Sequence, residues 1–385
     1  MRGLKLSAIA LIFGIGNAGT ANAVVVFQCP PQQAALERAL PAYLRELKIA
    51  SSLVTQASDS ALGTLSLALA GSRSDVQTLD FSTRAEFAIT TERVRLPLGG
   101  GKYRELHTVS KKEIVLAMLQ HGRTVVFKED ACSLDALINH VGVRQNIVAW
   151  AENLNWKWPN GGPAKWNNRY WRKGTPKPGV PAHVAVMDAF LHQDKYAIGC
   201  YTAAKLVIVQ GTLDYYRRVK PDAARVKRIE LLLLADGEPL VDVEPSAMWS
   251  FEKDFDARET ARPGKLLNLH ANVAKGNFVP GDWSYLLNTD ANSAGKTGYE
   301  GSNAIYLGSN RFDDFYNDHN HSYTYEQKLE EVFQWRHGVF NSVRDIAKRE
   351  VLSPHRVTLL GENIATGGLL IETRLIPSHF QGDTD

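Results

Sequence analysis

A single cysteine begins a helical segment in the middle of the chain. From Cys200 the sequence reads CYTAAKLVIVQGTLDYYRRV. Small and apolar residues recur along it at helical spacing, namely Ala204, Val207, Ile208, Gly211 and Tyr215. The unpaired N–H groups and the positive dipole end of such a helix stabilise a thiolate at its first residue, which is the nucleophilic form. The alternative is that Cys200 is a small buried hydrophobe, as most free cysteines are.

The N-terminal residues predict export. MRGLK is followed by an apolar run over residues 6–15 and then by ANAV, in which Ala21 and Ala23 fit a signal-peptidase site. The run is too short to span about 30 Å of hydrocarbon. We therefore expect a signal peptide over residues 1–23, cleaved after Ala23, and a periplasmic or secreted protein.

Later segments and the overall charge exclude some partners. No later stretch reaches the roughly 20 apolar residues of a membrane span, so we expect none in the mature chain. The 44 Lys and Arg nearly balance the 41 Asp and Glu, for a net charge of +3. This balance gives no electrostatic reason to bind nucleic acid, and we expect no such partner.

The three cysteines differ in their sequence settings. An oxidising compartment favours disulfides. Cys29 in QCPPQQ and Cys132 in EDACSL both lie in polar segments typical of loops. We expect these two to pair, which leaves Cys200 as the free thiol.

Five of the eight tryptophans precede the Cys200 helix, at Trp150, Trp156, Trp158, Trp166 and Trp171. Indole rings at this density either pack the edge of a core or line a cleft, for example as a carbohydrate platform. The sequence leaves both interpretations open.

An antiparallel sheet is predicted downstream of the Cys200 helix. Strand patterns cover residues 283–287, 303–308 and 311–315, and helical periodicity covers 325–335. A cysteine at a helix start followed by such a sheet is the α+β skeleton of papain-like and NlpC-like hydrolases and transferases. In these folds the strands carry the polar partners of the thiol.

Several motifs recur together in one known family. They are WNNRYW, PKPGV, CYTAAKLVIVQGTLDYY, FVPGDWSYLLN and GYEGSNAIYLG, with an aromatic pair and a histidine before the last helix. In this order, over residues 166–335, they resemble the small spore-coat type bacterial protein-glutamine gamma-glutamyltransferases, or transglutaminases. The resemblance implies a calcium-independent acyl transferase without a cofactor, in which Cys200 is the nucleophile. It also implies protein substrates with exposed glutamine and lysine, and we expect Trp166, Trp171 and Trp283 to contact substrate.

Two positions depart from the family pattern. The family tends to have Glu-Cys at the nucleophile, where this chain has Gly199-Cys200. It also has a Gly-Glu-Asn motif, where this chain has Gly301, Ser302 and Asn303, with Glu300 displaced by two places. A shift of two on a strand keeps the same face but moves the side chain about 6.6 Å along it.

The remaining candidates for a catalytic base are histidines. His319 in FYNDHNHSY fits the family's histidine position best, and His321 is the neighbouring option. A thiolate and imidazole pair suffices for acyl transfer, with Asp318 or Asn303 to orient the ring. The segment also fits a solvated polar loop. Two histidines without a third ligand at suitable spacing predict no metal site.

The chain divides into three expected parts after the signal peptide. Residues 24–149 form an accessory α/β segment, residues 150–340 the catalytic core, and residues 341–385 C-terminal strands that complete it. In that last part, HRVTLLGENIATGGLLIETRLI predicts two strands joined at residues 366–368.

Four functions remain open on this sequence. The first is a transglutaminase that forms glutamyl-lysine isopeptide cross-links. The second is a protein-glutamine deamidase, which hydrolyses the same thioester. The others are an NlpC-like cysteine peptidase or amidase on peptidoglycan, and a binding protein without catalytic activity.

Overall fold

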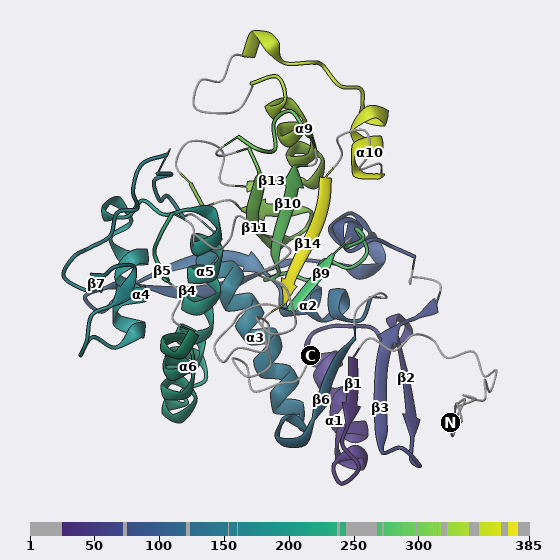
Figure 1. Ribbon diagram of the computed structural model, residues 1–385. Helices are drawn as coiled ribbons and strands as arrows, with labels where there is room; N and C mark the ends of the chain where they lie inside the picture. Colours follow the sequence, from purple (N-terminus) through teal and green to yellow (C-terminus); the bar gives the residue numbers. More distant parts are fainter. Residues whose placement is uncertain are drawn as a thin grey trace, which may run out of the picture.

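The fold was analysed in a computed structural model. The structure describes residues 25–71, 75–120, 124–152, 154–159, 161–236, 239–243, 268–271, 273–288, 290–296, 299–313, 315–316, 322–338, 346–362 and 369–375. Two sheets lie on either side of a central group of helices (Figure 1). The α+β fold expected from the sequence is therefore confirmed.

The first sheet has four strands in the order β2-β3-β1-β6, and only β1 and β6 are parallel. Helix α1 packs against it through an apolar stripe that includes Leu36 and Leu40. Phe27 stacks on Phe127 in its core, with ring centroids 4.9 Å apart. The elements are β1 (Val25–Gln28), α1 (Gln33–Glu46), β2 (Val54–Asp59), β3 (Thr64–Leu69) and β6 (Val125–Lys128).

A disulfide fixes this sheet to the central helices. It joins Cys29, directly after β1, to Cys132, two residues before α3 (Leu134–Ala151), with a Cα–Cα distance of 5.4 Å. Cys200 is the free thiol. Both expectations about the cysteines are confirmed.

Serine caps begin two helices between the sheets. The hydroxyl of Ser110 accepts from the backbone N–H of Glu113, and that of Ser133 accepts from Ala136. A hairpin precedes the first of these helices. The elements are β4 (Thr91–Gly99), β5 (Lys102–Val109) and α2 (Lys111–Met118).

Helices α3 and α5 (Cys200–Asp214) form the centre of the molecule and pack very closely. A Cβ added at Gly211 would lie 2.5 Å from the side chain of Ile147, and one at Gly142 would lie 2.5 Å from that of Tyr215. The Asn146 amide donates to the Gly211 carbonyl at 2.7 Å. Every residue of α5 after Cys200 is buried, polar ones such as Lys205 and Gln210 included, so the helix has no side that faces solvent.

Shorter elements surround α5. A π-helical turn at residues Tyr215–Val219 continues it and leads to α6. A two-stranded ribbon and α4 precede α5 in the chain. They lie on the side of the molecule far from the first sheet (Figure 1). The elements are β7 (Trp171–Arg172), β8 (Thr175–Pro176), α4 (Ala182–Leu191) and α6 (Ala223–Asp236).

The second sheet has six strands in the order β13-β12-β11-β10-β14-β9, and all its pairs are antiparallel. One face of β11 packs through Ile305 and Leu307 into the core around α3 and α5. The other face packs through Ala304 and Tyr306 into a second core that contains α9. The elements are β9 (Asn268–Ala271), β10 (Trp283–Asn288), β11 (Gly301–Gly308), β12 (Arg311–Asp313), β13 (Ser322–Tyr323), α9 (Tyr325–Trp335) and β14 (Leu369–Leu375).

A buried ion pair joins α3 to the second sheet. The Arg144 guanidinium contacts the Asp282 carboxylate at 2.9 Å, in the turn before β10, and both side chains are almost fully buried. Arg144 also donates to the Pro280 carbonyl and to His140. This contact sets the position of β10 and β11 relative to the helices.

The strands predicted over 283–287 and 303–308 and the helix predicted over 325–335 are confirmed, and the strand predicted over 311–315 is shorter, because β12 ends at Asp313. The C-terminal prediction was wrong in one part. HRVTLLG was predicted as a strand but lies in helix α10 (Pro354–Glu362). Pro354 occupies the first helical position, where its fixed φ is favourable, and the Ser353 hydroxyl accepts from the Arg356 N–H as a cap. The second predicted strand is β14, which joins the sheet between β10 and β9. Within the described ranges, each helix is too short or too polar to cross a membrane.

A buried glutamate supports the turn between β11 and β12. The Glu113 carboxyl accepts from the backbone N–H and the hydroxyl of Ser309. Burial raises the pKa of Glu113 from its usual 4.5 to about 7, although the Ser309 hydrogen bonds oppose the shift.

Stability should therefore depend on the protonation of Glu113. Because its pKa is higher in the folded state, its contribution is complete below pH 4.5 and is lost as the pH rises through about 7. The loss should amount to about 3 kcal/mol. Urea unfolding between pH 4.5 and 8 should show this decrease in wild type and in an exposed control, Glu105→Gln, but not in Glu113→Gln. An equal decrease in all three proteins would show that Glu113 is not the cause of this pH dependence.

Candidate active site

Cys200 is the first residue of α5 and is half-buried. Its Sγ accepts a hydrogen bond from the side-chain amide of Asn303 on β11, at 3.1 Å. The sulfur therefore lies where the start of the central helix meets the second sheet.

The orientation of Asn303 is fixed by an indole. Trp283 on β10 donates from Nε1 to the Asn303 Oδ1 at 2.8 Å. Because Oδ1 accepts from the indole, the amide N–H group is the one directed at the sulfur. Tyr201, next to the cysteine, packs edge-on against Trp283 with ring centroids 4.8 Å apart. A single cluster of rings thus holds both the thiol and its amide partner.

The backbone before Cys200 is held by hydrogen bonds from two directions. Lys157 and Lys165 exchange backbone hydrogen bonds with residues 196–198, on opposite sides of that segment. The Tyr316 hydroxyl donates to the Ile198 carbonyl at 2.9 Å. These bonds position the thiol before substrate binds, as a nucleophile requires.

A short segment, residues 240–243, crosses the start of α5. The Asp242 carbonyl accepts from the Gly199 N–H at 2.8 Å and from the Thr202 hydroxyl at 2.7 Å. The Val243 carbonyl oxygen lies only 1.5 Å from where a Cβ of residue 199 would be. Only glycine fits before the cysteine while this segment is in place.

Comparison with known proteins gives the family of this chain. A model of the protein-glutamine gamma-glutamyltransferase family matches residues 101–337, which is more than half of the chain. The chain belongs to this family. Acyl transfer from protein glutamine is the reaction of the family, so this transglutaminase-family chain is an acyltransferase of that kind.

The chain also resembles a solved structure. The transglutaminase from Geobacillus stearothermophilus, without its C-terminal extension, has a TM-score of 0.40 and 16% identity, over 66% of this chain and 99% of that chain. A search of curated protein sequences found no significant match to the chain.

The structure of this transglutaminase-family chain brings together some of the predicted catalytic residues and separates others. Cys200 and Asn303 are in contact. Ser302 has the strand parity of Ala304 and Tyr306, so its side chain is on the α9 face, away from the thiol. Glu300 lies just before β11, where its backbone carbonyl accepts from the Asn288 N–H. His319 and His321, and Asp318 beside them, lie outside the described residues.

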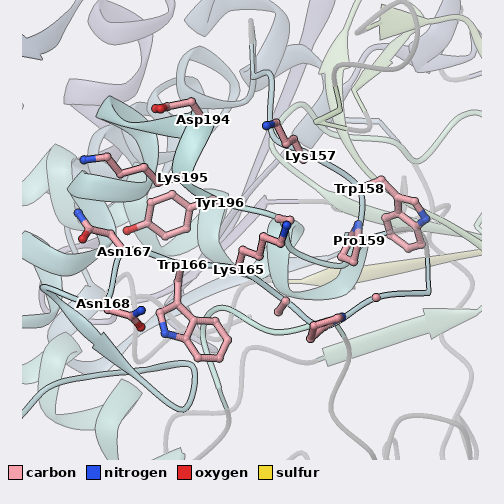
Figure 2. Close-up of a pocket in the computed structure, with 14 residues that line it drawn as sticks. Lys157, Trp158, Pro159, Lys165, Trp166, Asn167, Asn168, Asp194, Lys195 and Tyr196 are labelled. Atoms are coloured by element: carbon pink, nitrogen blue, oxygen red, sulfur yellow. The ribbon is translucent and has the colours of Figure 1, made fainter.

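The tryptophans divide between core and cavity. Trp171 and Trp283 are 1% and 0% exposed, so neither ring is available for the substrate contact predicted for them. Trp171 instead donates to the Tyr196 hydroxyl. Trp166 and Trp158 line a cavity (Figure 2), whose lining also includes Tyr196 and Ala197 of the segment that leads to Cys200. Both interpretations of the tryptophan cluster thus apply, to different rings.

Two site features were missed from the sequence. The hydrogen bond from Trp283 to Asn303 joins neighbouring strands, and only the pairing register brings them together. Residues 240–243 act through backbone carbonyls, which leave no mark in a sequence. The glycine at position 199 was the one available signal.

We expect Asn303→Ala to lower the reactivity of the Cys200 thiol about 10- to 100-fold, because a hydrogen bond to a charged group contributes about 1.5–3 kcal/mol. The rate of alkylation by iodoacetamide at pH 7 measures the reactivity of this thiol. Ser302→Ala is the matched control, since that side chain is next in sequence but on the other face. Equal alkylation rates in the two variants would show that the amide does not act on the thiolate.

We also expect Gly199→Ala to destabilise the protein by about 1–3 kcal/mol, because the added methyl group overlaps the Val243 carbonyl. Gly295→Ala is the control, since no atom lies within 4 Å of its added Cβ. Thermal unfolding measures both. An unchanged midpoint for Gly199→Ala would mean that residues 240–243 do not lie there in solution.

Proposed function

We propose that this chain is an exported transglutaminase that forms glutamyl-lysine cross-links through a thioester at Cys200. The observation that carries the proposal is the contact between the Cys200 thiol and the Asn303 amide at the start of α5, within the part of the chain that matches the family. The contact combines a nucleophile with a donor of hydrogen bonds in one place.

The reaction would proceed in two steps. The thiolate attacks the carboxamide carbon of a glutamine side chain, and the C–N bond breaks as ammonia leaves with a proton from the catalytic acid. A lysine amine then attacks the thioester, loses a proton to the same group, and releases the thiolate as the isopeptide bond forms. The first-turn N–H groups of α5 are suited to stabilise the oxyanion in both steps.

A proton carrier completes the proposed mechanism. We propose His319 for this role, with His321 and Glu300 as the other candidates. Asn303 would then hold the thiolate rather than orient the imidazole, because its amide N–H is directed at the sulfur. Ser302 would contribute through its place on the strand, not through contact with the thiol.

The cellular location is supported by the disulfide between Cys29 and Cys132. Such bonds form and persist in oxidising compartments. We propose that residues 1–23 are a signal peptide and that the enzyme cross-links exposed glutamine and lysine residues of proteins in the periplasm or outside the cell.

We expect the chain without residues 1–23 to incorporate a fluorescent primary amine into a glutamine-bearing protein and to release ammonia. Cys200→Ala should reduce both by at least about 1000-fold, because it removes the nucleophile. Fluorescence of the protein band and a coupled ammonia assay measure the two products. Alanine is smaller than cysteine and adds no bulk, so we expect Cys200→Ala to fold like wild type. Equal midpoints of thermal unfolding would confirm this.

The outcomes separate the remaining functions. Ammonia without amine incorporation would identify a deamidase. Cleavage of muropeptides without either product would identify a peptidase or amidase. Absence of all three activities in wild type would refute the proposed chemistry.

A further inference from the structure

A cavity of about 820 Å³ lies beside the segment that leads to Cys200. Its lining includes two indoles, Trp158 and Trp166, and three lysines, Lys157, Lys165 and Lys195 (Figure 2). Its size is that of a binding site for several residues of a peptide or for a small molecule. The ligand assigned to it rests on the proposed function.

The cavity carries an excess of positive charge. All three lysines are exposed, and among the described residues no carboxylate lies within ion-pair distance of their amines. Asp194 is the one acidic residue in the lining. An exposed and uncompensated group of lysines attracts anions and repels cations.

The cavity is next to the thiol along the backbone. Ala197 lines it and precedes Cys200 by three residues, so their Cα atoms are at most about 11 Å apart. Lys157 and Lys165 are the residues whose backbones pair with this segment. Trp158 packs edge-on against Tyr316 at 5.3 Å, and Tyr316 holds the Ile198 carbonyl. The cavity is therefore within reach of a chain bound at Cys200, about three or four extended residues away.

We propose that this cavity binds acidic residues that flank the reactive glutamine of the acyl-donor protein. The three lysines bind the carboxylates, and the indoles of Trp158 and Trp166 provide flat apolar surfaces for the rest of the segment. The cavity does not receive the acyl acceptor, because the lysine amine of an acceptor protein is itself a cation and is repelled. The structure thus assigns donor and acceptor to different approaches to the thiol.

The test uses the chain without residues 1–23 and two glutamine peptides of equal length. One has Asp and Glu on both sides of the glutamine, and the other has Asn and Ser at those positions. Versions with alanine in place of the glutamine report binding alone, by fluorescence anisotropy at 50 mM and 500 mM NaCl. Lys157→Gln, Lys165→Gln and Lys195→Gln are combined in one cavity variant. The control combines Lys102→Gln, Lys128→Gln and Lys227→Gln, which remove the same charge from exposed sites elsewhere.

Wild type should bind the acidic peptide about tenfold more tightly than the neutral one at 50 mM NaCl, and the difference should shrink at 500 mM. The cavity variant should lose this preference, both in binding and in the ratio of kcat/KM for the two donors, whereas the control variant should keep it. Trp166→Ala should weaken binding of both peptides.

Equal preference in the cavity and control variants would overturn the proposal. So would stronger displacement of the acidic peptide by a polyuronate than by the unlabelled peptide, since the cavity would then be a glycan site. Failure of the proposed transglutaminase reaction would give a different set of results. In that case neither peptide would incorporate amine, while the alanine-substituted acidic peptide would still bind wild type better than the cavity variant.

Discussion

The helix that begins with Cys200 can lie in the centre of the molecule only because two glycines remove side chains where it crosses α3. At Gly211 the backbones of the two helices approach more closely than a Cβ would allow, and the short hydrogen bond from Asn146 to the Gly211 carbonyl depends on that approach. Gly142 leaves room for the ring of Tyr215, which follows α5. Close packing of this kind has few alternative arrangements, because the interior has little free volume. The position of the cysteine thus depends on helix packing as well as on the hydrogen bonds around it.

Helix α3 also places the other half of the site. Its start is tied to the first sheet by the disulfide, and its middle holds the turn before β10 through the buried pair of Arg144 and Asp282. From that turn, β10 and β11 carry Trp283 and Asn303 to the sulfur. A buried charge left without its partner is costly, so loss of either member of the ion pair would disturb the sheet that presents Asn303. Segments far outside the catalytic motifs therefore determine the distance between thiol and amide.

Much of this could be predicted from local patterns. The helix from Cys200, the strands near Trp283 and Asn303, the terminal helix and the disulfide all follow from periodicity, turn residues and cysteine context. The face on which each strand residue lies could not be predicted, because it depends on register, and so Ser302 and Asn303 could not be distinguished. Nor could the burial of Trp171, since density of tryptophan does not indicate which rings reach solvent. HRVTLLG alternates like a strand, and the proline that starts a helix there is the signal that was not given enough weight.

The departure from the family pattern before the nucleophile has a consequence for the history of this enzyme. Gly199 and residues 240–243 occupy each other's space, so a larger residue at position 199 and the present path of that segment are mutually exclusive. The two regions are epistatic: glutamate at position 199 would be harmful on this background, and acceptable only after the path of residues 240–243 had changed. Any mutational path between this chain and a relative with Glu-Cys must therefore change both position 199 and residues 240–243. A substitution in one of these regions that such a relative tolerates need not be tolerated by this chain.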